Sequence, residues 1–284
     1  MMKLLKKMMV GLTSAAMLAG AFASAAVAEE VQENSDTYNM LLIGVDRRDE
    51  SWYGNSDVMI LVTVNPDKES IYLTSFMRDL YADIPGIGVQ KLNAACANGG
   101  PELCVETIKE NYQVQIDNYA MVDFNTMAEI VDTIGGVELE LTEAEVEFVN
   151  NHADSDNTLT GEGLMWLDGA QAVAHSRNRF TGSTYDFGRT ERQRKLLTSI
   201  FEKAKTDYED SKSSGTLQKL LSYMSHDLTG GDTLKLMTKI SDWLTYEMKE
   251  LRVPFDDMYY SQNEILTPTD MAATREKLQE ELYR

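Results

Sequence analysis

The sequence predicts an α/β fold: a single-domain α/β/α sandwich with helices on both faces of a mixed central sheet. Short apolar runs rich in β-branched residues alternate with longer segments of helical periodicity, which is typical of a layered α/β domain. After residue 37 the chain shows no internal repeat and no second linker, and this favours one domain over two.

The apolar runs are expected to form strands. The runs 56–64 and 70–77 are separated by Asn65-Pro66-Asp67-Lys68, a turn signal that predicts a β-hairpin between them. The first run ends in an acid, Asp46, and further short runs follow later in the chain. The expected strands are 39–46, 56–64, 70–77, 118–124, 137–141 and 250–255.

Helices are expected between and after these strands. Gly99-Gly100-Pro101 should open the first, because proline is favoured at an early helical position. A mixed stretch, 143–165, is expected to be loop with short helix. The expected helices are 101–112, 125–136, 168–179, 188–205, 216–227, 232–247 and 269–283.

The first 28 residues are expected to be a targeting segment outside the fold. Three lysines precede an apolar run, and Ala26-Val27-Ala28 fits a signal-peptidase site. An uncleaved anchor is the alternative, since about 20 apolar residues can span a bilayer. A polar linker, 29–37, follows. Both alternatives place the expected folded domain, 38–284, outside the cytoplasm, in the cell envelope, as a secreted or membrane-anchored protein.

Composition argues against nucleic-acid binding and against several catalytic classes. The chain carries a net charge of −20, whereas phosphate backbones bind basic faces. It contains no nucleophile elbow, no phosphate-binding P-loop and no dinucleotide-binding glycine motif, and its three histidines are scattered. Aspartate and arginine therefore remain as the candidate functional side chains.

Two acids at strand ends form the candidate metal site. Asp46 ends the first expected strand and Asp57 opens the second, so neighbouring strands would bring both carboxylates to one sheet edge. Such a pair suits Mg²⁺, which commonly takes one or two carboxylates together with substrate phosphates. The alternative is that both are ordinary loop acids.

The stretch HSRNRFTGSTYDFGRTERQRK, residues 175–195, is the candidate anion site, with six basic side chains against two acidic ones. Arginine forks match phosphate oxygens bidentately, and the helix start at 188 also favours an anion. Arg78 and Asp79 follow the third strand and could reach the same rim. The alternative is a set of surface ion pairs of little energetic weight. The residues expected to contact phosphate are Arg177, Arg179, Arg189, Arg192 and Gln193.

Cys96 and Cys104 are the two cysteines of the chain. In an exported protein an even count predicts a disulfide, and the intervening Asn98-Gly99-Gly100-Pro101 could turn the chain back. Two separate buried thiols are the alternative.

Seven motifs, taken in order, resemble the LytR-CpsA-Psr family. Each is weak alone, but seven in order behind an export segment are highly specific. They span about residues 38–205 and read LLIGVD, SDVMILVTVNP, SFMRDLY, KLNAACANGG, VDTIGGVELEL, LDGAQAVAHSRNRF and DFGRTERQRKLL.

This resemblance implies an α/β/α sandwich that holds a polyprenyl chain in an apolar tunnel. It also implies an extracytoplasmic transferase that moves a glycopolymer, as a phosphodiester, from a polyprenyl-pyrophosphate carrier to peptidoglycan. The implied partners are this carrier-linked glycopolymer, the peptidoglycan acceptor and the outer leaflet of the cytoplasmic membrane. The tunnel cannot be located from the sequence, although some of the 16 methionines could line it.

The resemblance also assigns roles to individual residues. Asp46 and Asp57 match the family's Mg²⁺-binding acids, with Mn²⁺ as a substitute. The implied catalytic residues are Arg78, Asp79 and Asp186, and Asp79 would activate the attacking hydroxyl or orient Arg78. The family's pyrophosphate-contacting positions are matched by Arg78, Arg177, Arg179, Arg189 and Gln193. Arg47, Lys91 and Arg192 are further residues expected to bind the substrate.

One departure from the family pattern lies next to the second acid. Members commonly have Arg-Ser-Asp where this chain has Asn55-Ser56-Asp57. Arg47 or Arg48 on the same loop could replace the lost cation. Two other functions stay open. The same site could hydrolyse polyprenyl pyrophosphate with water, or the chain could be a non-catalytic carrier-lipid binding or regulatory protein, which the missing cation makes plausible.

Overall fold

The computed structural model describes residues 37–47, 52–182, 186–207 and 216–284. The expected targeting segment 1–28, almost all of the linker 29–37, and Arg48 lie outside these residues. Within the described ranges, no helix combines the length and apolar character needed to cross a membrane.

A six-stranded mixed sheet forms the centre of the domain, in the order β10-β3-β2-β1-β6-β9. The expected hairpin is present, because β2 and β3 pair antiparallel on either side of a 3₁₀ turn at Pro66–Lys68. β1 pairs antiparallel with β2 and parallel with β6. The strands are β1 (Tyr38–Val45), β2 (Ser56–Asn65), β3 (Ser70–Phe76), β6 (Asn118–Asp123), β9 (Ser225–His226) and β10 (Glu247–Val253).

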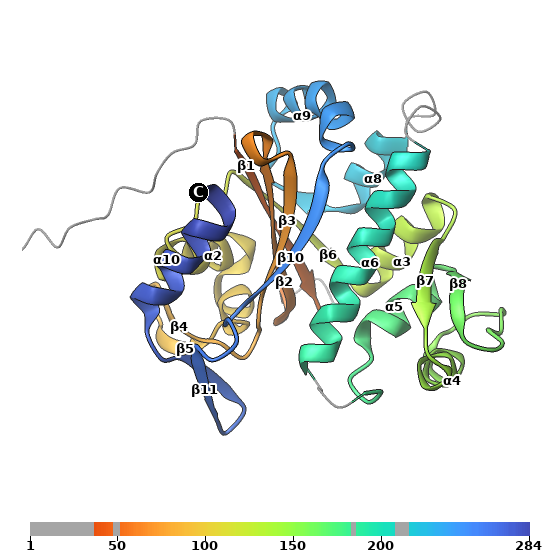
Figure 1. Cartoon of the computed structure of the whole chain (residues 1–284), viewed down its shortest axis with the longest axis horizontal. Coiled ribbons are helices and arrows are strands. Elements are labelled where there is room, and N and C mark those ends of the chain that lie inside the picture. The colour runs from red at the N-terminus through yellow and green to blue at the C-terminus, as the bar shows by residue number, and fades with distance from the viewer. Residues whose placement is uncertain (1–36, 48–51, 183–185, 208–215) are drawn as a thin grey trace, which may run out of the picture. The chain divides into compact units, whose positions relative to one another are not determined.

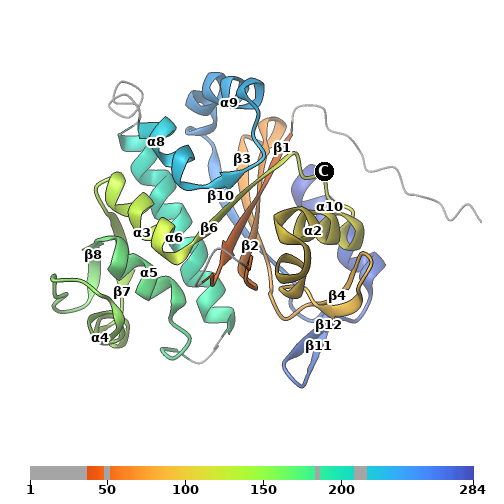
Figure 2. The ribbon, with the colours of Figure 1, turned by 180° about the vertical axis from the view of Figure 1, so that it is seen from behind.

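Helices cover both faces of this sheet (Figures 1 and 2), as the sequence predicts. One face carries α2 (Ala94–Tyr112) and α10 (Met271–Tyr283). The other carries α3 (Phe124–Thr133), α5 (Gly169–Arg177), α6 (Asp186–Thr206) and α8 (Thr216–Tyr223). α4 (Glu143–His152) packs on α5, and α9 (Gly230–Trp243) follows β9 in the chain.

The apolar core is divided by the sheet. A first cluster joins the sheet to α2 and α10 and contains Leu41, Phe76 and Ile108, each almost fully buried. A second joins α4, α5 and α6 to β7 (Val137–Leu141). At Gly169, an added Cβ would lie 2.1 Å from the carbonyl oxygen of Ala128 in α3, so only glycine permits this approach of α5 to α3.

Three small two-stranded sheets lie outside the central one. β7 was expected as a strand, and it pairs with β8 (Gly163–Leu167), an unpredicted strand that begins in the stretch 143–165 expected to be loop and short helix. The hairpins of β4 (Tyr81–Ile84) with β5 (Gly88–Lys91), and of β11 (Tyr259–Gln262) with β12 (Ile265–Pro268), were not predicted. Each of these strands is only four or five residues long, too short for a clear apolar period.

The predicted disulfide is wrong: Cys96 and Cys104 are free, buried thiols. The intervening glycines do not turn the chain back. They kink α2, with Gly100 at φ 73°, and the helix then continues. Burial, with a smaller contribution from Glu102, raises the pKa of Cys96 to about 12, and burial also raises the pKa of Cys104. Protonated thiols exchange slowly, because the thiolate is the nucleophile.

We therefore expect native protein, never treated with reductant, to react very slowly with iodoacetamide at pH 8. After unfolding in urea, still without reductant, both cysteines should be alkylated, as mass spectrometry would show. Alkylation of unfolded protein only after reduction would instead demonstrate a disulfide.

Candidate active site

The site begins where β1 ends and β2 starts. Asp46 follows the last residue of β1, and Asp57 lies at a bulge, because Val45 pairs with Ser56 while Gly44 pairs with Val58. Bulges of this kind re-aim a side chain. The structure places both acids in one cavity of about 550 Å³, lined by Asp46, Trp52, Asn55, Asp57, Arg78, Asn93 and Arg179.

A group of charged side chains, which we call the Arg–Asp cluster, adjoins this cavity. It is brought together from β2, from the loops after β3 and α5, from β5 and from the start of α6. Its members are Asp57, Arg78, Asp79, Lys91, Arg179, Asp186 and Arg189.

Arg78 is the centre of the cluster. Its Nη1 donates to Asp57 Oδ1 at 2.7 Å, and its Nη2 lies 3.2 Å from Asp186 Oδ2. Its Nε faces Asp79 Oδ2 at 3.4 Å. Burial by itself lowers the pKa of Arg78, but the hydrogen bond and charge of Asp57, with the charges of Asp186 and Asp79, raise the pKa overall. Arg78 is therefore a fixed cation.

Asp79 is held by two cations. Its Oδ1 accepts a hydrogen bond from Lys91 Nζ at 2.7 Å, and Arg78 lies on its other oxygen. Burial opposes ionisation of Asp79, but hydrogen bonding to Lys91 and the charge of Arg78 outweigh it and lower the pKa. A carboxylate with a lowered pKa is a weak proton acceptor.

Arg189 is the most deeply buried cation of the cluster, yet among the described residues it has one acidic side chain within ion-pair distance. It is 3% exposed, its Nη2 lies 3.5 Å from Asp186 Oδ1, and its Nε has no hydrogen-bond partner among the described residues. Burial, and then the charge of Arg78, lower the pKa of Arg189 to about 10, so it remains cationic at neutral pH. A buried donor without a partner is costly unless an acceptor binds there.

Arg179 is the most exposed cation of the cluster, and its ion pairs are long, with Nε 3.5 Å from Asp186 Oδ1 and Nη2 3.8 Å from Asp57 Oδ2. Other predicted residues lie around the cluster. Arg47 faces Asp123 at 3.7 Å, at the end of β6. Asn55, the departure from the family pattern, is exposed in the cavity beside Asp57.

Two predicted phosphate ligands point elsewhere. Arg177 is exposed and stacks over the ring of Phe124, with its guanidinium carbon 4.2 Å from the ring centroid. Arg192 is buried and donates to Glu145 Oε1 at 2.6 Å. The sequence could not separate these arginines from Arg179 and Arg189, because partners distant in the chain decide where each one points.

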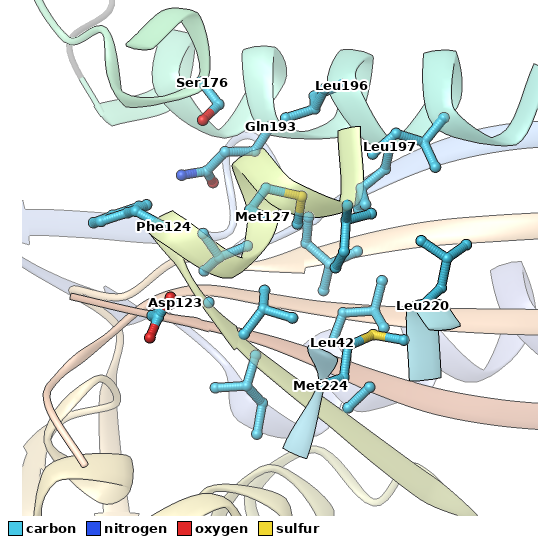
Figure 3. A pocket seen from close by; sticks show the side chains of 18 residues that line it. Leu42, Asp123, Phe124, Met127, Ser176, Gln193, Leu196, Leu197, Leu220 and Met224 are labelled. Atoms are coloured by element: carbon cyan, nitrogen blue, oxygen red, sulfur yellow. The ribbon is translucent and has the colours of Figure 1, made fainter. Parts of the chain in front are cut away.

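An apolar cavity of about 240 Å³ lies between the sheet and helices α3, α6 and α8. Asp123, Ser176 and Gln193 supply polar atoms toward one side, and Leu220 and Met224 lie on the other (Figure 3). Its lining is otherwise apolar, with residues such as Leu42, Val58, Ile60, Val122, Phe124, Met127, Ile130, Leu196, Leu197 and Ile200.

The charged and apolar regions meet along α6. Gln193 lines the apolar cavity, and its Oε1 has no partner within the described ranges. Arg189 lies one helical turn earlier, in the Arg–Asp cluster. The site therefore suits a ligand with an anionic head and a hydrocarbon tail.

Comparison with known proteins identifies the family. A model of the LytR_cpsA_psr family matches residues 8–281. This chain belongs to the LytR-CpsA-Psr family. The resemblance carried by the seven motifs is thereby confirmed.

A curated relative is the polyisoprenyl-teichoic acid–peptidoglycan teichoic acid transferase TagU of Enterococcus faecalis. It is 34% identical over 208 residues, which cover 72% of this chain and 65% of TagU. The chain thus matches slightly less than two thirds of the length of this relative.

Solved structures share the fold, which confirms the predicted α/β class. The crystal structure of Bacillus subtilis TagV has a TM-score of 0.69 and 26% identity, covering 87% of this chain and 97% of TagV. TagT from B. subtilis with bound octaprenyl pyrophosphate lipid has a TM-score of 0.65 and 22% identity, covering 87% of this chain and 90% of TagT.

The Lys91–Asp79 contact predicts a specific dependence of stability on pH. Folding lowers the pKa of Asp79, so its carboxylate contributes to the free energy of unfolding. This contribution is fully present above the unfolded pKa of about 3.9 and is lost as pH falls through the lowered folded pKa. Lys91→Met should raise the folded pKa and so reduce the stability lost on acidification from about pH 5 to pH 2.

Urea unfolding at several pH values measures this effect. Lys109→Met, on an exposed position of α2, serves as the control and should keep the wild-type pH dependence. An unchanged slope in Lys91→Met would show that the 2.7 Å contact does not set the pKa of Asp79.

Proposed function

We propose that this chain transfers a glycopolymer from a polyprenyl-pyrophosphate carrier to peptidoglycan, outside the cytoplasm. The observation that carries the proposal is the succession along α6 of buried Arg189, whose Nε has no hydrogen-bond partner among the described residues, and of Gln193, one turn later, which lines an apolar cavity. The teichoic acid transferase activity of TagU and the octaprenyl pyrophosphate bound to TagT support the same substrate class.

In the proposed reaction, a hydroxyl of the acceptor attacks the phosphorus that bears the glycopolymer. A new P–O bond forms, the phosphoanhydride bond breaks, and polyprenyl phosphate leaves with the bonding electrons, while the proton of the attacking hydroxyl passes to the departing phosphate or to water. No ATP is needed, because the energy resides in the donor's pyrophosphate. Arg78, Arg179 and Arg189 stabilise the charge that accumulates on the phosphate oxygens.

The role of Asp79 follows from its surroundings. A carboxylate held by Lys91 and Arg78, with a lowered pKa, is a poor general base. We therefore assign Asp79 the orientation of Arg78 and Lys91 rather than activation of the attacking hydroxyl. Asp186 orients Arg78, Arg179 and Arg189 in the same way.

The residues present also fit a magnesium ion. Asp46 and Asp57 line one cavity, and no group of three or more metal-binding side chains is found in the described part of the chain. Two carboxylates with substrate phosphates and water match the way Mg²⁺ is commonly held. Asp46 and Asp57 would hold the ion, which would supply positive charge to the transferring phosphate; Mn²⁺ is the expected substitute.

Metal binding is tested with geranyl pyrophosphate as the ligand, by calorimetry with and without Mg²⁺. We expect Mg²⁺ to raise the affinity of wild-type protein, and Asp57→Asn to remove this increase while the urea midpoint changes little. Asp67→Asn, in the turn at the far end of β2, is the control. A Mg²⁺ effect that persists in Asp57→Asn would remove Asp57 from the metal site.

The anion site is tested by comparing geranyl pyrophosphate with geranyl monophosphate. Arg189→Lys should weaken pyrophosphate binding by about 1.5–3 kcal/mol, because Lys lacks the planar fork. Asn55→Arg should tighten it if the missing family cation matters. The control is Arg194→Lys, since Arg194 pairs with Glu250 outside the cluster.

Equal affinity for both ligands in wild-type protein would contradict a pyrophosphate site. Turnover of a lipid-linked glycopolymer, with and without peptidoglycan, then separates the functions. Product that depends on the acceptor supports transfer. Phosphate release without an acceptor would indicate hydrolysis, and binding without turnover would indicate a carrier-lipid binding protein.

A further inference from the structure

We propose that Glu145 and Arg192 are positioning residues that fix the segment 178–181 and thereby set where Arg179 meets a bound pyrophosphate. This inference rests on the function proposed above. Neither side chain belongs to the Arg–Asp cluster, and both act through the backbone that carries Arg179.

Arg192 binds the segment at both of its ends. Its Nη1 donates to the carbonyl oxygen of Asn178 at 3.3 Å, and its Nη2 donates to the carbonyl oxygen and to Oγ1 of Thr181, each at 2.8 Å. These bonds use the two terminal nitrogens of one planar guanidinium, so the spacing of residues 178 and 181 is fixed by a rigid group.

Glu145 holds Arg192 in this orientation. Its Oε1 accepts from Arg192 Nε at 2.6 Å and lies 3.5 Å from Nε2 of buried His175. Its Oε2 accepts from the backbone and the hydroxyl of Thr142, which begins α4. Burial opposes ionisation of Glu145, but the nearby His175 and the hydrogen bonds from Thr142 and Arg192 lower the pKa. The carboxylate is therefore ionised at neutral pH and tied to a helix start.

The segment has its own internal bonds, and these converge on one buried side chain. Asn178 is fully buried, and its Oδ1 accepts from the backbone N–H groups of Phe180 and Thr181. Its Nδ2 donates to Thr181 Oγ1 at 2.7 Å. The turn is thus a compact unit that Arg192 attaches to α6.

Arg179 needs this support because its own contacts are weak. Its side chain is 38% exposed, and its ion pairs with Asp186 and Asp57 are 3.5 and 3.8 Å long. Exposed pairs of this length contribute little to fixing a side chain. The position of the Arg179 backbone is set instead by Asn178, directly before it, and Thr181, two residues after it, both bound to Arg192.

A double-mutant cycle separates positioning from general stability. The variants are Arg192→Lys and Arg179→Ala, singly and together, with affinity for geranyl pyrophosphate as the readout. We expect Arg192→Lys to weaken binding roughly tenfold to a hundredfold, the range of one charge-assisted contact. It should have no further effect once Arg179 is alanine, because it acts through that side chain.

Two further variants serve as controls. Arg194→Lys is matched in burial, helix and chemistry: both arginines are 8% exposed, but Arg194 binds Ser75 and Glu250 instead. It should keep wild-type affinity. Glu145→Gln keeps an oxygen acceptor for Arg192 and should lose less affinity than Glu145→Ala; this pair also carries the test if Arg192→Lys fails to fold.

Hydrogen exchange provides a readout that needs no ligand. The backbone amides of Phe180 and Thr181 should exchange faster than in wild-type protein in Arg192→Lys, and at the wild-type rate in Arg194→Lys. Additive losses in the cycle, equal losses in the two lysine variants, or unchanged exchange would overturn the inference. If wild-type protein fails to prefer pyrophosphate, the proposed function and this inference both fall; preference for pyrophosphate with unaffected Arg192→Lys removes the inference alone.

Discussion

The site depends on the contacts that one guanidinium makes with three carboxylates. Arg78, at the end of β3, contacts Asp57 from β2, its neighbour Asp79, and Asp186 at the start of α6. The pairing of β2 with β3 brings Asp57 to Arg78, and the packing of α6 on the sheet brings Asp186 to it. Because each carboxylate is also shared with Arg179, Lys91 or Arg189, a shift of Arg78 would disturb every other pair.

The cations of the cluster are supported unequally. Arg78 has three acidic neighbours, whereas Arg189 has one, at 3.5 Å, and is more deeply buried. Burying the charge of Arg189 in this way opposes folding, and the packing around the side chain offsets this cost. An incoming phosphate would supply the missing negative charge to a group already held in place, so little reorganisation accompanies binding.

The sequence was informative where chemistry is local. The turn at Asn65–Lys68 predicted the β2–β3 hairpin, and alternation predicted the layered fold. The sequence was misleading where the direction of a side chain depends on partners that are distant in the chain. Arg179 and Arg192 read alike in the sequence, yet Glu145, 47 residues from Arg192, turns the second away from the cluster. Glycines expected to close a disulfide loop only kink α2, and no sequence signal located the apolar cavity.

The apolar cavity has a kinetic consequence for the proposed reaction. In that reaction donor and leaving group would carry the same polyprenyl tail, so contacts with residues such as Leu197, Leu220 and Met224 would hold both equally. Binding that does not distinguish substrate from product lowers KM without raising kcat. The spent carrier would therefore compete with fresh donor for the same cavity, and its departure would become a step that can limit turnover. The membrane that receives the spent lipid would then govern the rate as much as the arginines do.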